Sequence, residues 1–275
     1  MNKTQSIIKI ISLIILILLV IFFIIPNRNK RQINTDISNI QATTTYNFEL
    51  KKINYNTDFY DIEAVYENHF FDNQKLIEKQ ILKDVNQVLE EWKIGGDIQK
   101  EEENLNKQFP DRPKIKYQYS VDYHKYDSGK MNMISYVFYN YMFTGGAHGN
   151  TYLNTFVFDK NGLVKINDLL DLKNNINDIK ITRLIYNKIK DNHIVNESAH
   201  EMLIEGLGLN NLDNNNNYTG TQDKKFSFKD NLTQFIVLDE GIIFIFDQYQ
   251  IAPYIDGNPE VLLTWDELKP YMINK

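Results

Sequence analysis

A glycine-rich segment with a single histidine is the part of this sequence best suited to binding chemistry. Gly145-Gly146-Ala147-His148-Gly149 lies between two segments rich in Tyr, Val, Ile and Phe. Three glycines in five positions allow a turn that would strain other residues, and they leave backbone amides exposed. His148 is the only titratable side chain among them. No helix is expected to begin here and no Lys or Ser follows at P-loop spacing, which excludes a phosphate-binding loop.

Three roles are open to His148: holding the turn by a hydrogen bond to neighbouring backbone, contacting a ligand, or acid–base catalysis. A second segment, residues 249–254, contains Pro253 and precedes Gly257, which together would shape a loop at the end of a strand. This loop is either a packed corner or part of the same surface as the glycine turn. The candidate ligand-binding residues are Gly145, Gly146, Ala147, His148, Gly149, Asn150, Tyr249, Pro253 and Tyr254.

The other histidines and the acidic residues form no recognisable catalytic or metal-binding pattern. His200-Glu201 begins like a zinc-protease helix, but no second histidine follows four residues later. His193 and His200 are seven residues apart across an irregular stretch, and His69 and His124 are expected on strand surfaces. No serine stands in a nucleophile elbow, and no pair of acids stands out for glycoside cleavage. We therefore assign no catalytic residue, metal site or cofactor.

The distribution of charge sets the N-terminus apart from the remainder. The chain has 275 residues, with 30 Lys and Arg against 36 Asp and Glu. Residues 1–31 hold five of the cations and no acid, which leaves residues 32–275 with 25 cations against 36 acids, a net charge of −11. Nucleic-acid binding requires neutralisation of phosphates and is excluded for such an acidic body. The favoured macromolecular partner is a basic protein.

An apolar run at residues 7–25 predicts one N-terminal transmembrane helix. Only Lys9 and Ser12 interrupt it, and it is long enough to cross a hydrocarbon core of about 30 Å. No small residues follow to form a cleavage site, and the chain has no cysteine, which excludes a cleaved signal peptide and a lipoprotein anchor. Residues 1–6 form a short flank and residues 26–45 a polar tether. Basic residues stand on both sides of the span, so charge alone does not orient it.

The body contains segments with strand periodicity and segments with helix periodicity. Strands are expected at residues 46–53, 60–66, 114–126, 131–143, 151–158, 163–166, 234–238, 241–246 and 260–264. Helices are expected at residues 73–93, 176–191, 197–205 and 265–272, and the acidic run 101–103 is expected to be a solvated segment. Because strands and helices do not alternate strictly, the predicted fold class is α+β, with antiparallel sheets and packed helices.

Several segments together resemble a family of extracytoplasmic bacterial domains of unassigned biochemistry. Gly-Gly-Ala-His-Gly at residues 145–149 looks like its signature, and residues 156–170 and 246–254 match its usual layout. The family includes the outer part of RsiV-type anti-sigma factors, which bind lysozyme, and the N-terminal part of PdaC-type peptidoglycan deacetylases. The resemblance implies a PdaC-like subdomain at residues 46–110, an RsiV-like subdomain with the glycine turn at residues 111–275, and a body outside the cytoplasmic membrane.

Two departures from the family limit the function that the resemblance implies. The RsiV type has a cytoplasmic sigma-binding segment before its span, where this sequence has six residues, and the PdaC type continues into a metal-binding deacetylase domain. We expect a single-pass membrane protein whose body recognises a cell-wall-related ligand such as peptidoglycan, or a basic wall-degrading protein such as lysozyme. The alternatives are an enzyme acting on peptidoglycan or a similar glycan, with His148 in its site, and a purely structural envelope protein.

Overall fold

The computed structural model describes residues 50–67, 75–173, 176–213, 219 and 227–273. By its internal contacts the chain divides into residues 1–41 and residues 42–275, and all described residues belong to the second unit. The predicted transmembrane helix at residues 7–25 and the tether at residues 26–45 lie outside the described residues. Within the described ranges, no helix is both long and apolar enough to cross a membrane.

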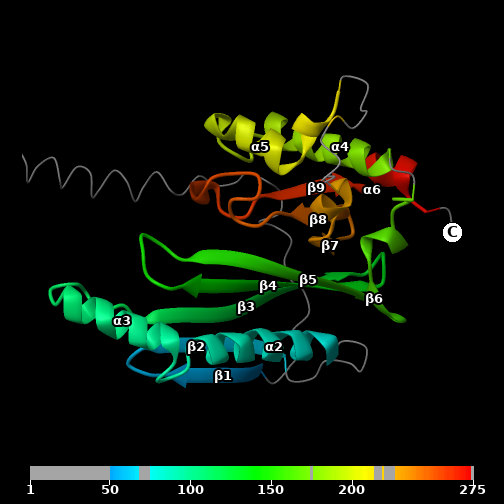
Figure 1. Cartoon of the computed structure of the whole chain (residues 1–275). Helices are drawn as coiled ribbons and strands as arrows, with labels where there is room; N and C mark the ends of the chain where they lie inside the picture. The colour runs from blue at the N-terminus through cyan, green and yellow to red at the C-terminus, as the bar shows by residue number, and fades with distance from the viewer. Residues whose placement is uncertain (1–49, 68–74, 174–175, 214–218, 220–226, 274–275) are drawn as a thin grey trace, which may run out of the picture. The chain divides into compact units, whose positions relative to one another are not determined.

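The larger sheet begins with a strand whose apolar residues alternate. In β2 (Tyr60–Glu67), Ile62 and Ala64 are completely buried while the residues between them are partly exposed. Successive side chains of a strand point to opposite faces, so this alternation directs one face toward a core. The other strands are β1 (Leu50–Asn56), β3 (Tyr117–Ser128), β4 (Met133–Phe143), β5 (Asn150–Asp159) and β6 (Gly162–Val164), and the six follow one another in sequence order (Figure 1).

This sheet is mixed, which corrects the prediction of purely antiparallel sheets. β2 and β3 are parallel, with Ile62 opposite Tyr119, whereas the other neighbouring strands are antiparallel. A parallel pair requires a long crossover. Here the crossover contains α2 (Lys75–Glu91), which confirms the helix expected at residues 73–93, and α3 (Asp97–Gln108), which the sequence pattern does not predict.

Helix α2 covers the apolar face of the six-stranded sheet. Its buried residues Ile77, Ile81, Val85 and Val88 recur at spacings of three and four, which places them on one side of the helix. They pack with Trp92 and with the inward side chains of β2 to β5 into one core. This core unites the two predicted subdomains, because the expected boundary at residue 110 falls between β2 and β3, which pair directly.

A three-stranded antiparallel sheet forms the other half of the unit. It contains β7 (Phe235–Val237), β8 (Gly241–Ile245) and β9 (Glu260–Thr264), in that order. One face packs against α4 (Asn177–Asp191), α5 (His200–Gly206) and α6 (Trp265–Leu268) in a second apolar core, as Figure 1 shows. These elements confirm the strands and helices expected after residue 176, and the molecule is α+β.

Two side-chain hydroxyl groups of the six-stranded sheet accept hydrogen bonds from the backbone of β7 and so join the two sheets. The Ser135 hydroxyl of β4 accepts the Val237 N–H at 3.0 Å, and Ser135 is completely buried. The Thr155 hydroxyl of β5 accepts the Phe235 N–H at 3.1 Å. Since β7 is an edge strand, these hydroxyls satisfy backbone groups that would otherwise be buried without a partner.

Replacing Ser135 by alanine is expected to lower the free energy of unfolding by about 1–3 kcal/mol, because the Val237 N–H would stay buried without an acceptor. Urea unfolding of the full-length chain, followed by tryptophan fluorescence, measures the change. Ser120→Ala is the matched control, since Ser120 is half-buried on the same face of the neighbouring strand β3. Equal losses in the two variants would contradict a special role for the Ser135 hydroxyl.

Candidate functional site

The turn between β4 and β5 carries the Gly-Gly-Ala-His-Gly segment. Gly145 and Gly146 have φ angles of 92° and 106°, a region that residues with a Cβ rarely adopt. Gly149 is needed for another reason: its φ is not positive, but a Cβ there would lie 2.5 Å from the Tyr141 ring. The predicted constraint on the turn therefore has a conformational origin at two glycines and a steric origin at the third.

His148 is exposed, and its ring makes two hydrogen bonds and stacks with two tyrosine rings, those of Tyr249 and Tyr254. Its Nδ1 lies 3.1 Å from the Gly149 carbonyl oxygen. A carbonyl can only accept, so Nδ1 carries the hydrogen, and in the neutral ring Nε2 is then an acceptor. The Tyr249 hydroxyl donates to Nε2 at 3.1 Å. The Tyr254 ring stacks on the imidazole with 3.8 Å between centroids and 18° between planes.

The two tyrosines come from the loop that follows β8. Tyr249 has a φ of 64°, and its side chain is 45% exposed. Pro253 precedes a single 3-10 turn, Tyr254–Asp256, which ends at Gly257 with a φ of 68°. Tyr254 is 37% exposed. We call His148, Tyr249 and Tyr254 the His148 cluster.

Side-chain hydrogen bonds to β5 hold this loop beside the glycine turn. Among the described strands, none pairs with the outer edge of β5 between Asn150 and Thr155, since the pairing with β6 begins at Val157. Gln248 accepts the Thr151 N–H at 2.7 Å, and Asp247 accepts the Leu153 N–H at 2.8 Å. Burial raises the pKa of the Asp247 carboxyl, and the hydrogen bond from Leu153 offsets part of that rise.

The structure thus brings together candidate residues that are about 100 positions apart in the sequence. Gly145, Gly146 and Gly149 shape the turn, and the exposed Ala147 and Asn150 flank His148. The hydrogen bond to Gly149 matches the turn-holding role of His148, while the exposed rings suit contact with a ligand. One hydrogen bond of the imidazole joins it to a backbone carbonyl and the other to a tyrosine hydroxyl. A catalytic histidine is commonly oriented by a carboxylate, and neither of these two partners is one.

The other described histidines lie apart from the His148 cluster. His124 is exposed on β3 and stacks edge-on against Tyr139. His193 follows α4 and lies 3.8 Å from Glu197, whereas His200 begins α5, so these two do not share a helix face. His69 lies outside the described residues. In the described part of the chain, no three His, Asp or Glu side chains are grouped as metal ligands.

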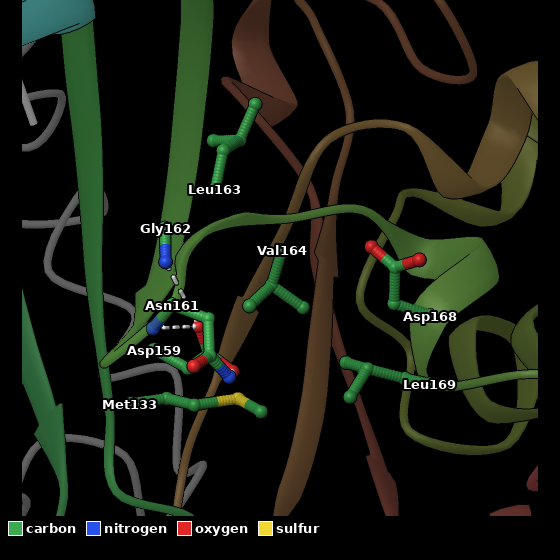
Figure 2. Close-up of a pocket in the computed structure, with 8 residues that line it drawn as sticks. All are labelled: Met133, Asp159, Asn161, Gly162, Leu163, Val164, Asp168 and Leu169. Atoms are coloured by element: carbon green, nitrogen blue, oxygen red, sulfur yellow. Dashed lines mark hydrogen bonds between the residues drawn. The ribbon is translucent and has the colours of Figure 1, made fainter. Parts of the chain in front are cut away.

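A hollow of about 190 Å³ lies at the far end of β5, where the strand turns into β6. Its polar groups are used in local structure: Asp159 accepts the backbone N–H of Asn161 and of Gly162, and Asp168 accepts that of Lys165. Figure 2 shows Asp159 and Asn161 turned toward each other across this bend. The hydrogen bonds of Asp159 stabilise the β5–β6 turn, and the residues that line the hollow do not include the His148 cluster.

One acidic residue outside the predicted site, Glu260, occupies an unusual position. Glu260 opens β9 and is half-buried, and burial raises the pKa of its carboxyl. It interacts electrostatically with Tyr126 and Tyr139 of the six-stranded sheet. In the sequence, Glu260 is marked only as an acid on the same strand face as Leu262 and Thr264. The surroundings of Glu260 depend on a sheet formed by residues more than 100 positions earlier.

Gly146→Val is expected to lower the free energy of unfolding by about 1 kcal/mol or more, because valine would be forced into a positive φ. No atom lies within 4 Å of the added Cβ, so the effect reports the backbone alone. Gly149→Val should cost more, since Tyr141 must move. Urea unfolding measures both, with Ala147→Val in the same exposed turn as control. A Gly146→Val chain that unfolds like wild type would contradict the constraint.

Two protein-family models match adjacent parts of the chain. The model described as deacetylase PdaC matches residues 25–151. The model described as a protein of unknown function, DUF3298, matches residues 167–266. The glycine turn and His148 thus lie in the first segment, while Tyr249 and Tyr254 lie in the second. A comparison with curated proteins gives no match.

Similar solved structures include two members of the DUF3298 family. One, from Bacteroides fragilis, is 16% identical with a TM-score of 0.48, covering 83% of this chain and 94% of that one. The other, from Pseudomonas aeruginosa, is 15% identical with a TM-score of 0.42, covering 82% of this chain and 94% of that one. The two family-model matches confirm the resemblance expected from the sequence: the chain joins a PdaC-type segment to a DUF3298 segment, and the His148 cluster is assembled from both.

Proposed function

We propose that this protein is a membrane-anchored recognition module of the cell envelope, with its body outside the cytoplasmic membrane and the His148 cluster on its ligand-binding surface. The observation that carries the proposal is the stack of three exposed rings, fixed from two distant segments by hydrogen bonds. A site fixed in this way suits contact with a ligand. The family models support the envelope context, because one of them is named for the deacetylase PdaC.

The His148 cluster has the properties of an interface anchor. Tyrosine contributes a large, rigid surface with few rotatable bonds, and tyrosines are frequent among the residues that dominate binding energy. The rings are already held in place by one another, so little side-chain freedom remains to be lost on binding. Ile255, next to Tyr254, is 75% exposed and extends the apolar surface.

The charge of the body favours a basic protein as the ligand. Residues 32–275 carry a net charge of −11, which attracts a cationic partner and accelerates its association. A basic wall-degrading protein such as lysozyme combines this charge with the envelope location, and the resemblance to the outer part of RsiV-type proteins supports the same choice. Peptidoglycan is the alternative ligand. The alternative functions are those of an enzyme that acts on peptidoglycan and of a structural envelope protein.

The membrane topology has a direct test in cells. Protease added to intact cells, or to spheroplasts where an outer membrane is present, is expected to degrade the segment after residue 31, because the proposal places it outside the cytoplasmic membrane. An antibody against the C-terminus follows the loss, and a cytosolic protein that stays intact shows that the membrane is sealed. A body protected in both preparations would reject the proposed topology.

Binding to lysozyme is expected to be saturable, and its association rate is expected to fall as salt rises. Exposed charges are screened beyond a Debye length of about 8 Å near physiological salt, whereas packed contacts set the dissociation rate. Surface plasmon resonance with the full-length chain in nanodiscs of neutral lipid measures both rates, against empty nanodiscs. A neutral protein of similar size is the control for adhesion.

Two variants separate the His148 cluster from the general charge. Tyr254→Ala is expected to weaken the lysozyme affinity by about tenfold, mainly through faster dissociation. Tyr55→Ala is the matched control, since Tyr55 is 44% exposed on β1. Absence of saturable binding at every salt concentration would reject the lysozyme partner, and release of acetate or sugar from peptidoglycan by the same protein would favour the enzyme.

A further inference from the structure

A second unusual site lies between the two sheets, on the face of the three-stranded sheet that does not pack against the helices. In β9 the residues Val261 and Leu263 belong to the core shared with α4, so Glu260 and Leu262 point the other way. Glu260 therefore faces the six-stranded sheet, in agreement with its electrostatic interaction with Tyr126 and Tyr139.

The Glu260 carboxylate has no partner within the described ranges. It accepts no hydrogen bond there and pairs with no cation, and desolvation is the sole cause of its raised pKa. The hydroxyl groups of Tyr126 and Tyr139 likewise make no hydrogen bond to the part of the chain that the structure describes. A half-buried carboxylate is destabilised when it lacks a counter-charge. A cation placed beside Glu260 would therefore be stabilised by the carboxylate.

The face of the six-stranded sheet that is turned toward Glu260 carries three aromatic rings that contact one another. His124, Tyr126 and Tyr139 project from the same face, because His124 and Tyr126 alternate along β3 and Tyr139 lies on the corresponding face of β4. The His124 ring lies edge-on to Tyr139, with 5.2 Å between centroids and 63° between planes, and 6.5 Å from Tyr126 at 67°. Perpendicular rings present both faces and edges to a group placed among them.

The combination of one carboxylate with three aromatic rings favours an organic cation over a metal ion. Ring faces attract ammonium and guanidinium groups, and the attraction grows when water is excluded. A calcium or magnesium ion would require several oxygen ligands, whereas the carboxylates here are Glu260 and the more exposed Asp122, which faces Tyr139 in the strand register. Lysine and arginine side chains provide the matching groups on a basic protein.

We propose that Glu260, His124, Tyr126 and Tyr139 form a subsite that receives a lysine or arginine side chain of the basic protein partner. We call it the Glu260 subsite. The inference rests on the proposed recognition function and adds to it a specific anchoring point, distinct from the His148 cluster. The negative charge of the body guides the partner to the surface, and the Glu260 subsite then holds one of its cationic side chains.

The test compares two charge-removing variants of the full-length chain in neutral nanodiscs. Glu260→Gln is expected to weaken lysozyme affinity by about tenfold or more, mainly through dissociation, because it leaves the bound cation without its counter-charge. Glu101→Gln removes the same charge from an exposed position on α3 and is expected to change the affinity less than about twofold. Equal effects of the two variants, or no effect of Glu260→Gln, would overturn the subsite while leaving the recognition function intact.

The aromatic contribution is tested with Tyr139→Phe and Tyr139→Leu. The first keeps the ring and is expected to bind lysozyme like wild type, and the second is expected to weaken binding. Leucine and phenylalanine variants that bind equally well would overturn the aromatic part of the proposal. Thermal unfolding at pH 7 verifies folding: Glu260→Gln is expected to melt no lower than wild type, because it removes a carboxylate that burial disfavours.

A small probe separates this proposal from the identity of the partner. Butylammonium is expected to give saturation-transfer NMR signals with the wild-type chain that are reduced for Glu260→Gln, whereas butanol, its neutral counterpart, gives none that depend on Glu260. Butylammonium binding that depends on Glu260, together with no binding of lysozyme, would support the subsite and reject the lysozyme partner. Butylammonium signals that are equal in wild type and Glu260→Gln would overturn the subsite.

Discussion

The unpaired edge of β5 is the constraint on which the rest of the arrangement depends. Backbone N–H groups cannot remain buried without acceptors, and among the described strands only β4 pairs with residues 151–155, which leaves their outer edge without a partner strand. Side chains of Gln234, Asp247 and Gln248 take the place of a strand: Gln234 accepts the Thr155 N–H and donates to the Leu153 carbonyl, and the other two accept from Leu153 and Thr151. Through these bonds, the C-terminal half is fixed in register with the larger sheet.

This edge also explains why the two family-model segments form one structure. The segment that matches the PdaC model ends at Thr151, the second residue of β5, and Thr151 bonds to Gln248 of the segment that matches DUF3298. The remaining residues of β5 lie between the two matched segments, and side chains of the DUF3298 segment cover their edge as well. The imidazole of His148 then meets rings that belong to the other segment. A fragment containing either segment alone would expose backbone groups and would contain only part of the His148 cluster.

The sequence predicts those elements whose stability comes from apolar periodicity. Helix α2 was predicted because Ile77, Ile81, Val85 and Val88 follow the helical repeat, and the β3–β4 hairpin because both strands are rich in aromatic and β-branched residues. Helix α3 has no buried residue, so no apolar repeat marks it. Its partly buried Ile98 packs against the core of the six-stranded sheet, and polar contacts such as the ion pair between Glu102 and Arg112, which is outside the helix, add to this attachment.

Long-range pairing is what local patterns could not provide. Nothing local distinguishes the parallel partner of β2 from an antiparallel one, and the environment of Glu260 arises only when β9 is placed over β3 and β4. The residues of the His148 cluster could be predicted as candidates because glycine, histidine, proline and tyrosine stand out in their segments. Their contacts with one another required the folded chain.

The backbone at Tyr249 sets folding stability against the proposed recognition role of this loop. A positive φ at a residue with a Cβ costs on the order of 1 kcal/mol, a cost that glycine would not incur and asparagine would incur less. The chain nevertheless has tyrosine there, and its hydroxyl orients His148. Selection for thermostability alone would therefore favour glycine at this position and would remove one ring of the His148 cluster. If the cluster binds a ligand as proposed, a form of the protein stabilised in the absence of that ligand would lose part of its binding site here.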